Sequence, residues 1–244
     1  MNDMNSGLVV DRDKGMQEIR TPYFPEQPAG LRIAAKIISW VFHPVFVPVM
    51  VIWFLIYKHP WLFTGFDSMQ KPRLLAMAAV MFTLFPLVTI LLLKGLKFID
   101  SIYLRTQRER VIPFIACMIW YFWIAYVWNN FGKTGEGFDI PHSAVQFAFG
   151  AFISTVIGLM VNVRMKVSLH AISMGVVLAF FVLMAMTQDL NFFVYLSIVI
   201  LATGLVCTAR FIVSDHTPNE IYAGLATGIV SLLIGYRIEL LLSR

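Results

Sequence analysis

The chain has 244 residues, of which 59% are hydrophobic and 14% are charged, and its formal net charge is +5. Soluble domains are about 45–50% apolar and about 25% charged, so this composition indicates a membrane protein and excludes an ordinary soluble domain. The two cysteines, Cys117 and Cys207, both lie inside apolar stretches, which favours small core residues and gives no disulfide framework.

The first 30 residues are polar and mixed in charge, and they contain three prolines. We interpret residues 1–30 as a flexible polar tail or a short surface segment, and we expect no secretory signal, because a charged start is not followed by a short apolar core and a cleavage site. Residues 31–244 are expected to form one transmembrane domain.

Seven apolar segments follow the tail. A helix needs about 20 residues to cross the hydrocarbon core of a membrane, and backbone groups in lipid must pair internally. The pattern therefore predicts an all-α fold, a polytopic transmembrane helical bundle of six to seven spans. The number stays open because the first segment contains His43, Pro44 and Pro48, so it either kinks or begins as an interfacial helix. The segments are 33–57, 74–93, 111–129, 143–163, 169–187, 191–208 and 220–242.

Lysine and arginine are distributed unequally over the connections. With seven alternating spans, one side carries 13 of these residues and the other carries 6. A general positive-inside bias produces such a count. On the richer side, however, the charges cluster in three patches, each joined to a span. An even number of spans separates each pair, so the patches share one membrane face and can converge. They are RTQRERVIPF (105–114), RMKVSLHA (164–171) and RFIVSDHTPNEIYAG (210–224).

The side chains of the three patches suit phosphoryl transfer. Arginine binds phosphate through two parallel hydrogen bonds, and the charge of about −1.5 to −2 on a phosphate monoester calls for more than one arginine. Of two histidines at one face, one can attack and the other can supply a proton. A carboxylate beside the attacking histidine fixes its tautomer. The patches lack the acidic cluster that would hold Mg²⁺.

The three patches resemble the tripartite signature of the type 2 phosphatidic acid phosphatase superfamily, which includes lipid phosphatases and vanadium haloperoxidases. That signature reads Lys-x6-Arg-Pro, then Pro-Ser-Gly-His, then Ser-Arg-x5-His-x3-Asp. The third patch keeps the full spacing from Ala209 and Arg210 to His216 and Glu220, with alanine in place of serine and glutamate in place of aspartate.

The other two patches depart further from the signature. The second reads Val-Ser-Leu-His at 167–170, so it keeps the serine and the histidine and replaces the proline and the glycine. In the first, Arg105 stands at the lysine position and Pro113 at the proline position, whereas Ile112 replaces the arginine and Arg108 and Arg110 lie nearby.

The resemblance implies an integral-membrane hydrolase that removes phosphate from a lipid phosphate or diphosphate through a phosphohistidine, with no metal and no cofactor. It implies His216 as the nucleophile, Glu220 as its orienting carboxylate and His170 as the acid. The departures equally permit the alternative, a catalytically inactive lipid-phosphate binding or carrier protein on the same scaffold. The phosphate-binding residues that the resemblance implies are Arg105, Arg108, Arg110, Ser168 and Arg210.

Several of these residues also have a purely structural interpretation. Thr217 to Glu220 read as a capping box with proline at the first helical position, so Glu220 is equally explained as a helix cap. The arginines of the first patch could contact anionic headgroups. A metal site formed by His216, Glu220 and His170 can be drawn, but neighbouring arginines disfavour a cation. Asp215 is expected to be a solvated loop residue. The histidines beside prolines, His43, His59 and His142, are interpreted as interfacial or packing residues.

The expected partners are a lipid phosphate substrate and membrane lipids, and no nucleic acid, because the aromatic run 119–128 is itself a span. Which lipid is bound and the oligomeric state stay open.

The charge count places the patches in the cytoplasm, whereas most bacterial members of the resembled superfamily work at the outer face of the inner membrane. Without the four arginines that would bind phosphate in the first and third patches, the count falls to nine against six. We therefore expect a bacterial inner-membrane protein with its site at the periplasmic face.

Overall fold

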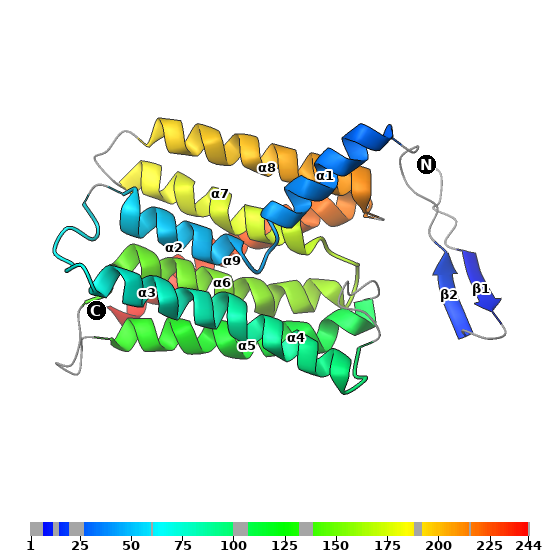
Figure 1. Cartoon of the computed structure of the whole chain (residues 1–244), viewed down its shortest axis with the longest axis horizontal. Helices are drawn as coiled ribbons and strands as arrows, with labels where there is room; N and C mark the ends of the chain where they lie inside the picture. Colours follow the sequence, from blue (N-terminus) through cyan, green and yellow to red (C-terminus); the bar gives the residue numbers. More distant parts are fainter. Residues whose placement is uncertain are drawn as a thin grey trace.

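The computed structural model of the chain describes residues 7–11, 15–19, 27–59, 61–99, 107–131, 139–187, 192–214 and 216–243. Helices make up most of these ranges, and six helical stretches are long and apolar enough to cross a membrane. The predicted all-α polytopic bundle is therefore confirmed, and the chain is an integral membrane protein (Figure 1). The six stretches are Gln70–Gly95, Gln107–Asn130, His142–Asn162, Leu169–Thr187, Phe193–Val213 and Pro218–Leu242.

Two shorter helices precede the first of these stretches, and one of the long stretches is built from three consecutive pieces. The helices are α1 (Ala29–Val41), α2 (Val47–Tyr57), α3 (Gln70–Ala79), the π-helix η1 (Val80–Leu84), α4 (Phe85–Gly95), α5 (Gln107–Asn130), α6 (His142–Asn162), α7 (Leu169–Thr187), α8 (Phe193–Val213) and α9 (Pro218–Leu242).

The predicted segment 33–57 is divided between α1 and α2. Pro44 has no N–H and restricts the residue before it, so α1 ends at Val41, and Pro48 lies in the first turn of α2, where a missing N–H costs nothing. The 11 residues of α2 are about 17 Å long, roughly half of the hydrocarbon thickness. Neither helix is long enough to span alone. Of the two predicted alternatives, the structure therefore has six long spans preceded by shorter helices.

A π-helical turn interrupts the first long stretch. Pro86 cannot donate to the carbonyl of Phe82 four residues earlier, and its ring crowds that carbonyl. The chain widens at η1, directly before the proline, and the hydroxyl of Tyr121 on α5 donates to the freed carbonyl of Phe82 at 3.3 Å. A carbonyl inside the membrane thus keeps a partner, as the absence of water in lipid requires.

Helix α9 packs closely against α6 and α7 through small residues. Gly224 and Gly228 have the four-residue spacing that lets helix backbones approach in membranes. A Cβ atom added at Gly228 would lie 2.1 Å from the carbonyl oxygen of Ile172, and one at Gly224 would lie 2.8 Å from that of Ser168. The first three turns of α9 are therefore held against the N-terminal part of α7.

A short hairpin lies within the segment that the sequence predicted as a polar tail. Strands β1 (Gly7–Asp11) and β2 (Gly15–Ile19) pair antiparallel, with Gly7 opposite Ile19 and Asp11 opposite Gly15. The hairpin lies beside the end of the bundle at which α1 begins (Figure 1).

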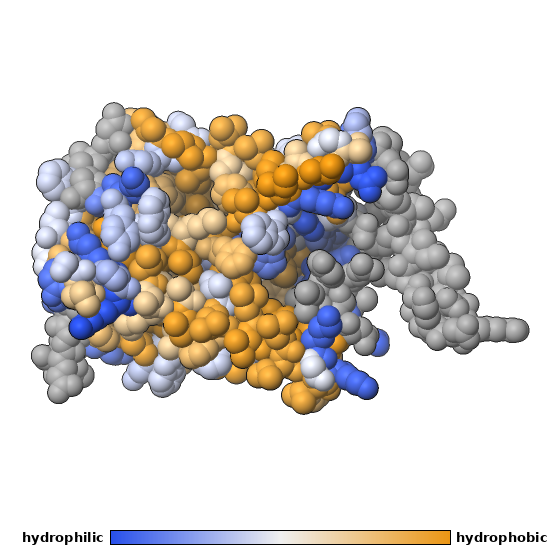
Figure 2. Space-filling view, in the orientation of Figure 1, coloured by the Kyte–Doolittle hydropathy of each residue, from blue (hydrophilic) through white to orange (hydrophobic). Residues whose placement is uncertain are grey.

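The surface of the bundle is divided along its length. Figure 2 shows apolar side chains over the middle of the visible face and hydrophilic side chains towards both ends. Exposed apolar residues such as Ile198, Leu201 and Leu205 on α8 belong to the middle part of that helix. This distribution suits a bundle whose sides contact lipid and whose ends contact water.

Candidate functional site

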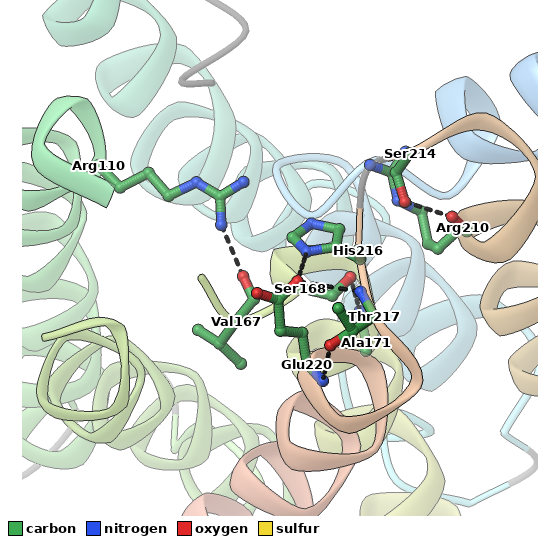
Figure 3. A network of polar contacts seen from close by, with 9 residues as sticks. All are labelled: Arg110, Val167, Ser168, Ala171, Arg210, Ser214, His216, Thr217 and Glu220. Carbon is green, nitrogen blue, oxygen red and sulfur yellow. Dashed lines mark hydrogen bonds and ion pairs between the residues drawn. The ribbon is translucent and has the colours of Figure 1, made fainter. Parts of the chain in front are cut away.

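The three patches predicted from the sequence meet at one end of the bundle (Figure 3). The guanidinium of Arg110, in the first turn of α5, donates from Nη1 to the carbonyl of Val167 at 2.7 Å. The backbone N–H of Ser168, just before α7, donates to the carbonyl of Glu220 in the first turn of α9 at 3.2 Å. These two bonds join the first patch to the second and the second to the third.

His216 and Glu220 form a buried pair in the third patch. Nδ1 of His216 lies 3.0 Å from Oε2 of Glu220, and both residues are buried. In Figure 3 the imidazole lies directly above the carboxylate of Glu220, with the guanidinium of Arg110 to one side. An ionised Glu220 accepts the proton of Nδ1, which leaves Nε2 of a neutral ring without a proton.

Glu220 also caps α9. The same Oε2 atom accepts from the backbone N–H of Thr217 at 3.1 Å, and the N–H of Glu220 donates to the hydroxyl of Thr217 at 3.3 Å. The predicted capping box is confirmed, and it coexists with the bond to His216. Because the cap fixes the carboxylate against the backbone, it also fixes the position at which the imidazole is held.

Two arginines act electrostatically on His216. Burial lowers the pKa of His216, and the positive charges of Arg110 and Arg210 lower it further, whereas the hydrogen bond and the negative charge of Glu220 oppose that shift. Arg110 is itself buried, and Arg210 lies in the last turn of α8. Figure 3 shows the two arginines on opposite sides of His216. An anion bound at this end would therefore meet positive charge from two helices.

Ser168 is fully buried at the start of α7. Its hydroxyl accepts from the backbone N–H of Ala171 at 3.4 Å, the position of a helix N-cap. The structure therefore gives the side chain of this predicted phosphate ligand a capping role at the start of α7, while its backbone N–H makes the bond to α9.

His170 is turned towards α1. Its Nε2 lies 2.9 Å from the carbonyl oxygen of Ser39, and its ring packs edge-on against His43 with 5.4 Å between centroids. Burial and the charge of Arg210 lower the pKa of His43. Both histidines therefore lie close to the site, and α1 covers His170. Neither Ser39 nor His43 was predicted to belong to the site, and the available signal was the His43-Pro44 break that ends α1 beside them.

The remaining predicted residues lie apart from this cluster or outside the described part of the chain. Arg108 is exposed, and its position two residues before Arg110 on one helix turns it to the opposite face of α5. Arg105 and Asp215 lie outside the described residues. Within the described ranges, no three histidine, cysteine, aspartate or glutamate side chains gather as a metal site would require, so His216, Glu220 and His170 do not form the metal group that could be drawn from the sequence.

A second buried carboxylate lies at the other end of α9. Glu239 is almost fully buried, and one of its oxygens contacts Nδ1 of His142 while the other accepts from Nε2 of Gln146 at 2.9 Å. This group was not predicted from the sequence. The signal was available, because a glutamate inside a predicted span is rare and usually has a partner.

Comparison of the chain with protein-family models, with curated proteins and with solved structures gives no match. The class of protein is therefore inferred from the geometry of the fold and of the site. It is an integral membrane protein with a buried histidine–glutamate pair flanked by two arginines at one end of its bundle.

Proposed function

We propose that the protein is an integral-membrane hydrolase that removes phosphate from a lipid phosphate or diphosphate, with a phosphohistidine formed on His216. The observation that carries this proposal is the buried 3.0 Å bond between Nδ1 of His216 and Oε2 of Glu220, placed between two arginines. Such a pair holds an imidazole in one tautomer and stabilises the positive ring that forms when it attacks.

The reaction has two steps. Nε2 of His216 forms a bond to the terminal phosphorus while that phosphorus loses its P–O bond to the rest of the lipid. The leaving group takes a proton and departs as an alcohol from a lipid phosphate, or as a lipid monophosphate from a diphosphate. Water then cleaves the P–N bond, which releases phosphate and restores the neutral ring. Arg110 and Arg210 offset the negative charge of the phosphoryl group in both steps.

The lowered pKa of His216 supports this assignment. A nucleophilic imidazole must be neutral, and burial together with two nearby guanidinium groups keeps His216 neutral to a lower pH than an ordinary histidine. The resemblance of the third patch to the type 2 phosphatidic acid phosphatase signature supports the same role, because its histidine and carboxylate stand at the matching spacing.

The orientation of His170 favours a second candidate. The resemblance assigns His170 as the acid for the leaving lipid, yet its Nε2 is bound to the carbonyl of Ser39. Proton donation from Nε2 requires that this bond open, by movement of α1 or rotation of the ring. A protein in which α1 stays closed would bind a lipid phosphate without turnover, the alternative that the sequence departures also permit.

Phosphate release by detergent-purified protein tests the two candidates. Wild-type protein should release phosphate from at least one member of a panel of lipid phosphates and diphosphates, with or without a metal chelator, and His216→Ala should not. Binding of a lipid phosphate with no release from any member of the panel would favour the second candidate. Equal release by His216→Ala would overturn the assignment of the nucleophile.

We further propose that the protein resides in a bacterial inner membrane with the site at the periplasmic face, as the resemblance implies. Asp139 is exposed at the opposite end of the bundle from the site, and Arg164 is exposed at the site end. In intact cells, an impermeant maleimide should then label Arg164→Cys and not Asp139→Cys, with wild-type protein as the control for Cys117 and Cys207. The reverse labelling pattern would place the site in the cytoplasm.

A further inference from the structure

An apolar groove of about 640 Å³ opens between α2 and the α3–η1 stretch. Its volume lies within the range of roughly 300–1,000 Å³ that is usual for ligand sites. The two helices that form its walls lie side by side in the view of Figure 1. One wall includes Phe46, Val49 and Trp53, and the other includes Leu75, Ala79 and Thr83.

Among the described residues that line the groove, Thr83 alone has a hydroxyl, and that hydroxyl donates to the carbonyl of Val45 at 2.7 Å. These residues therefore present no hydroxyl proton to an occupant. The bond also fixes the start of α2 against η1. No charged residue lines the groove within the part of the chain that the structure describes. The groove therefore suits a hydrocarbon chain and does not suit a polar headgroup.

The backbone at the groove is irregular. Thr83 and the preceding Ala79 lie on and beside η1, the π-helical turn produced ahead of Pro86. Single π-helical turns inside α-helices occur often at functional sites, because they change the direction of side chains and the width of a helix. Here the turn borders the groove.

One end of the groove, at Phe46, lies near the candidate site. The ring of Phe46 lies 6.0 Å from that of His43, and the ring of His43 lies 5.4 Å from that of His170. The charge of Arg210 in turn reaches His43, where it contributes to the lowered pKa. From Phe46 the groove follows α2 for about two turns, or roughly 10 Å, to Trp53 and thus into the apolar part of the bundle.

We infer that this groove binds one apolar chain of the lipid phosphate, with the phosphate at the arginines and the chain extending from Phe46 towards Trp53. The inference rests on the proposed function for the identity of the headgroup. It adds that α2 and α3–η1 select the substrate by the length and thickness of one hydrocarbon chain.

Larger side chains in the groove should impair the hydrolysis of long-chain substrates and leave that of short ones unchanged. Ala79→Phe places a ring in the groove from one wall, and Met50→Trp, at another lining position, narrows it from the other. Each variant should raise KM for a long-chain lipid phosphate about tenfold, since a buried chain is stabilised in proportion to its methylene groups. Hydrolysis of a short, water-soluble phosphate monoester should stay unchanged. Ala226→Phe, at an exposed position of α9, is the matched control and should behave as wild type towards both substrates.

A photoactivatable lipid phosphate gives a readout that does not depend on turnover. A lipid phosphate with a diazirine in its chain should crosslink to residues of α2 and η1, and Ala79→Phe should lose this crosslink. Equal crosslinking by the corresponding uncharged lipid alcohol would show ordinary boundary lipid and would overturn the inference. So would unchanged KM for the long substrate in both groove variants.

The same two experiments separate this inference from the proposed function. Crosslinking in the groove without phosphate release from any substrate would overturn the hydrolase and would support the groove as the chain site of a lipid-phosphate binding protein. Phosphate release with no response to either groove variant would support the hydrolase and overturn the groove.

Discussion

Helix α9 has a buried glutamate near each of its ends, and each glutamate contacts a histidine. At the first end, Glu220 meets His216, whose side chain is only 3% exposed. At the second end, Glu239 meets His142, whose side chain is 75% exposed. The residue types are the same, but the histidine is desolvated at one end and solvated at the other.

The two histidine–glutamate pairs also differ in the charge of the groups around them. Arg110 and Arg210 act on His216, whereas the second hydrogen bond of Glu239 comes from the neutral amide of Gln146. A histidine–carboxylate contact therefore does not define a catalytic site by itself. Burial of the ring, together with positive charge that can receive an anion, distinguishes the Glu220 end as the candidate for phosphoryl transfer.

Removal of each histidine should give the largest contrast between the two ends. We expect His216→Ala to lose at least a thousandfold in kcat for a lipid phosphate, because His216 is the residue proposed to form the P–N bond. We expect His142→Ala to stay within twofold of wild type. Phosphate release and lipid-phosphate binding should be measured on both, and binding by His216→Ala should persist because both arginines remain. A comparable loss of activity in the two variants would mean that the two ends act together and would contradict the distinction.

Conversion of each glutamate to glutamine should give the next largest contrast. Glu220→Gln keeps the capping box, since glutamine serves in it as well as glutamate. It removes the negative charge that stabilises the imidazolium and fixes the tautomer, so kcat should fall about a hundredfold. Glu239→Gln should leave kcat unchanged. Thermal unfolding of both variants in detergent is the control for folding. Full activity of Glu220→Gln would reduce Glu220 to a helix cap.

The sequence predicted the Glu220 end and missed the Glu239 end for a physical reason. His216 directly precedes the N-cap residue Thr217, and the capping box turns the carboxylate of Glu220 back to that point, so local sequence fixes their contact before any tertiary packing is known. His142 and Glu239 are 97 residues apart, and His170 and Ser39 are 131 apart. Contacts of that separation depend on which helices pack together, and hydropathy does not specify this.

The fold was likewise predictable where local sequence decides it and not where the packing of helices does. Hydropathy predicted the long spans, because a segment inside lipid must be apolar and must pair its own backbone N–H and C=O groups as a helix. It left the segment 33–57 open, because its 25 residues with their prolines suit either a kinked span or a segment that begins as an interfacial helix. The choice between Arg108 and Arg110 was also open. It depends on the rotation of α5 about its axis, which is set by the packing of Arg110 against Val167.

The pH dependence of activity should distinguish the two ends more finely. The positive charge of Arg110 contributes to the lowered pKa of His216, and removal of a cation favours the protonated ring and raises that pKa. In Arg110→Gln the neutral nucleophile should therefore be lost at a higher pH, and the acid limb of kcat/KM should move upward. Arg237→Gln, an exposed position two residues from Glu239, should leave the acid limb in place. The limb is read from the shape of the profile, so weaker substrate binding in Arg110→Gln does not affect it. An unmoved limb in Arg110→Gln would mean that a group other than His216 controls the acid side.

Substitution of Glu239 or of its partner Gln146 should have the smallest effect on activity and a measurable effect on stability. Glu239→Met removes the acceptor of the Gln146 amide, and Gln146→Met leaves a buried carboxylate with one donor fewer. Each should destabilise the fold by about 1–3 kcal/mol with kcat unchanged, because a polar group is left without its partner in an apolar interior. The double variant replaces both polar groups with apolar ones, and it should recover part of the loss, since removal of both partners costs less than removal of either. Thermal unfolding of the four proteins in one detergent measures this coupling. Strictly additive losses would show that the bond contributes nothing to stability, and a fall in kcat in any of the three variants would connect the Glu239 end to the reaction that we assign to the other.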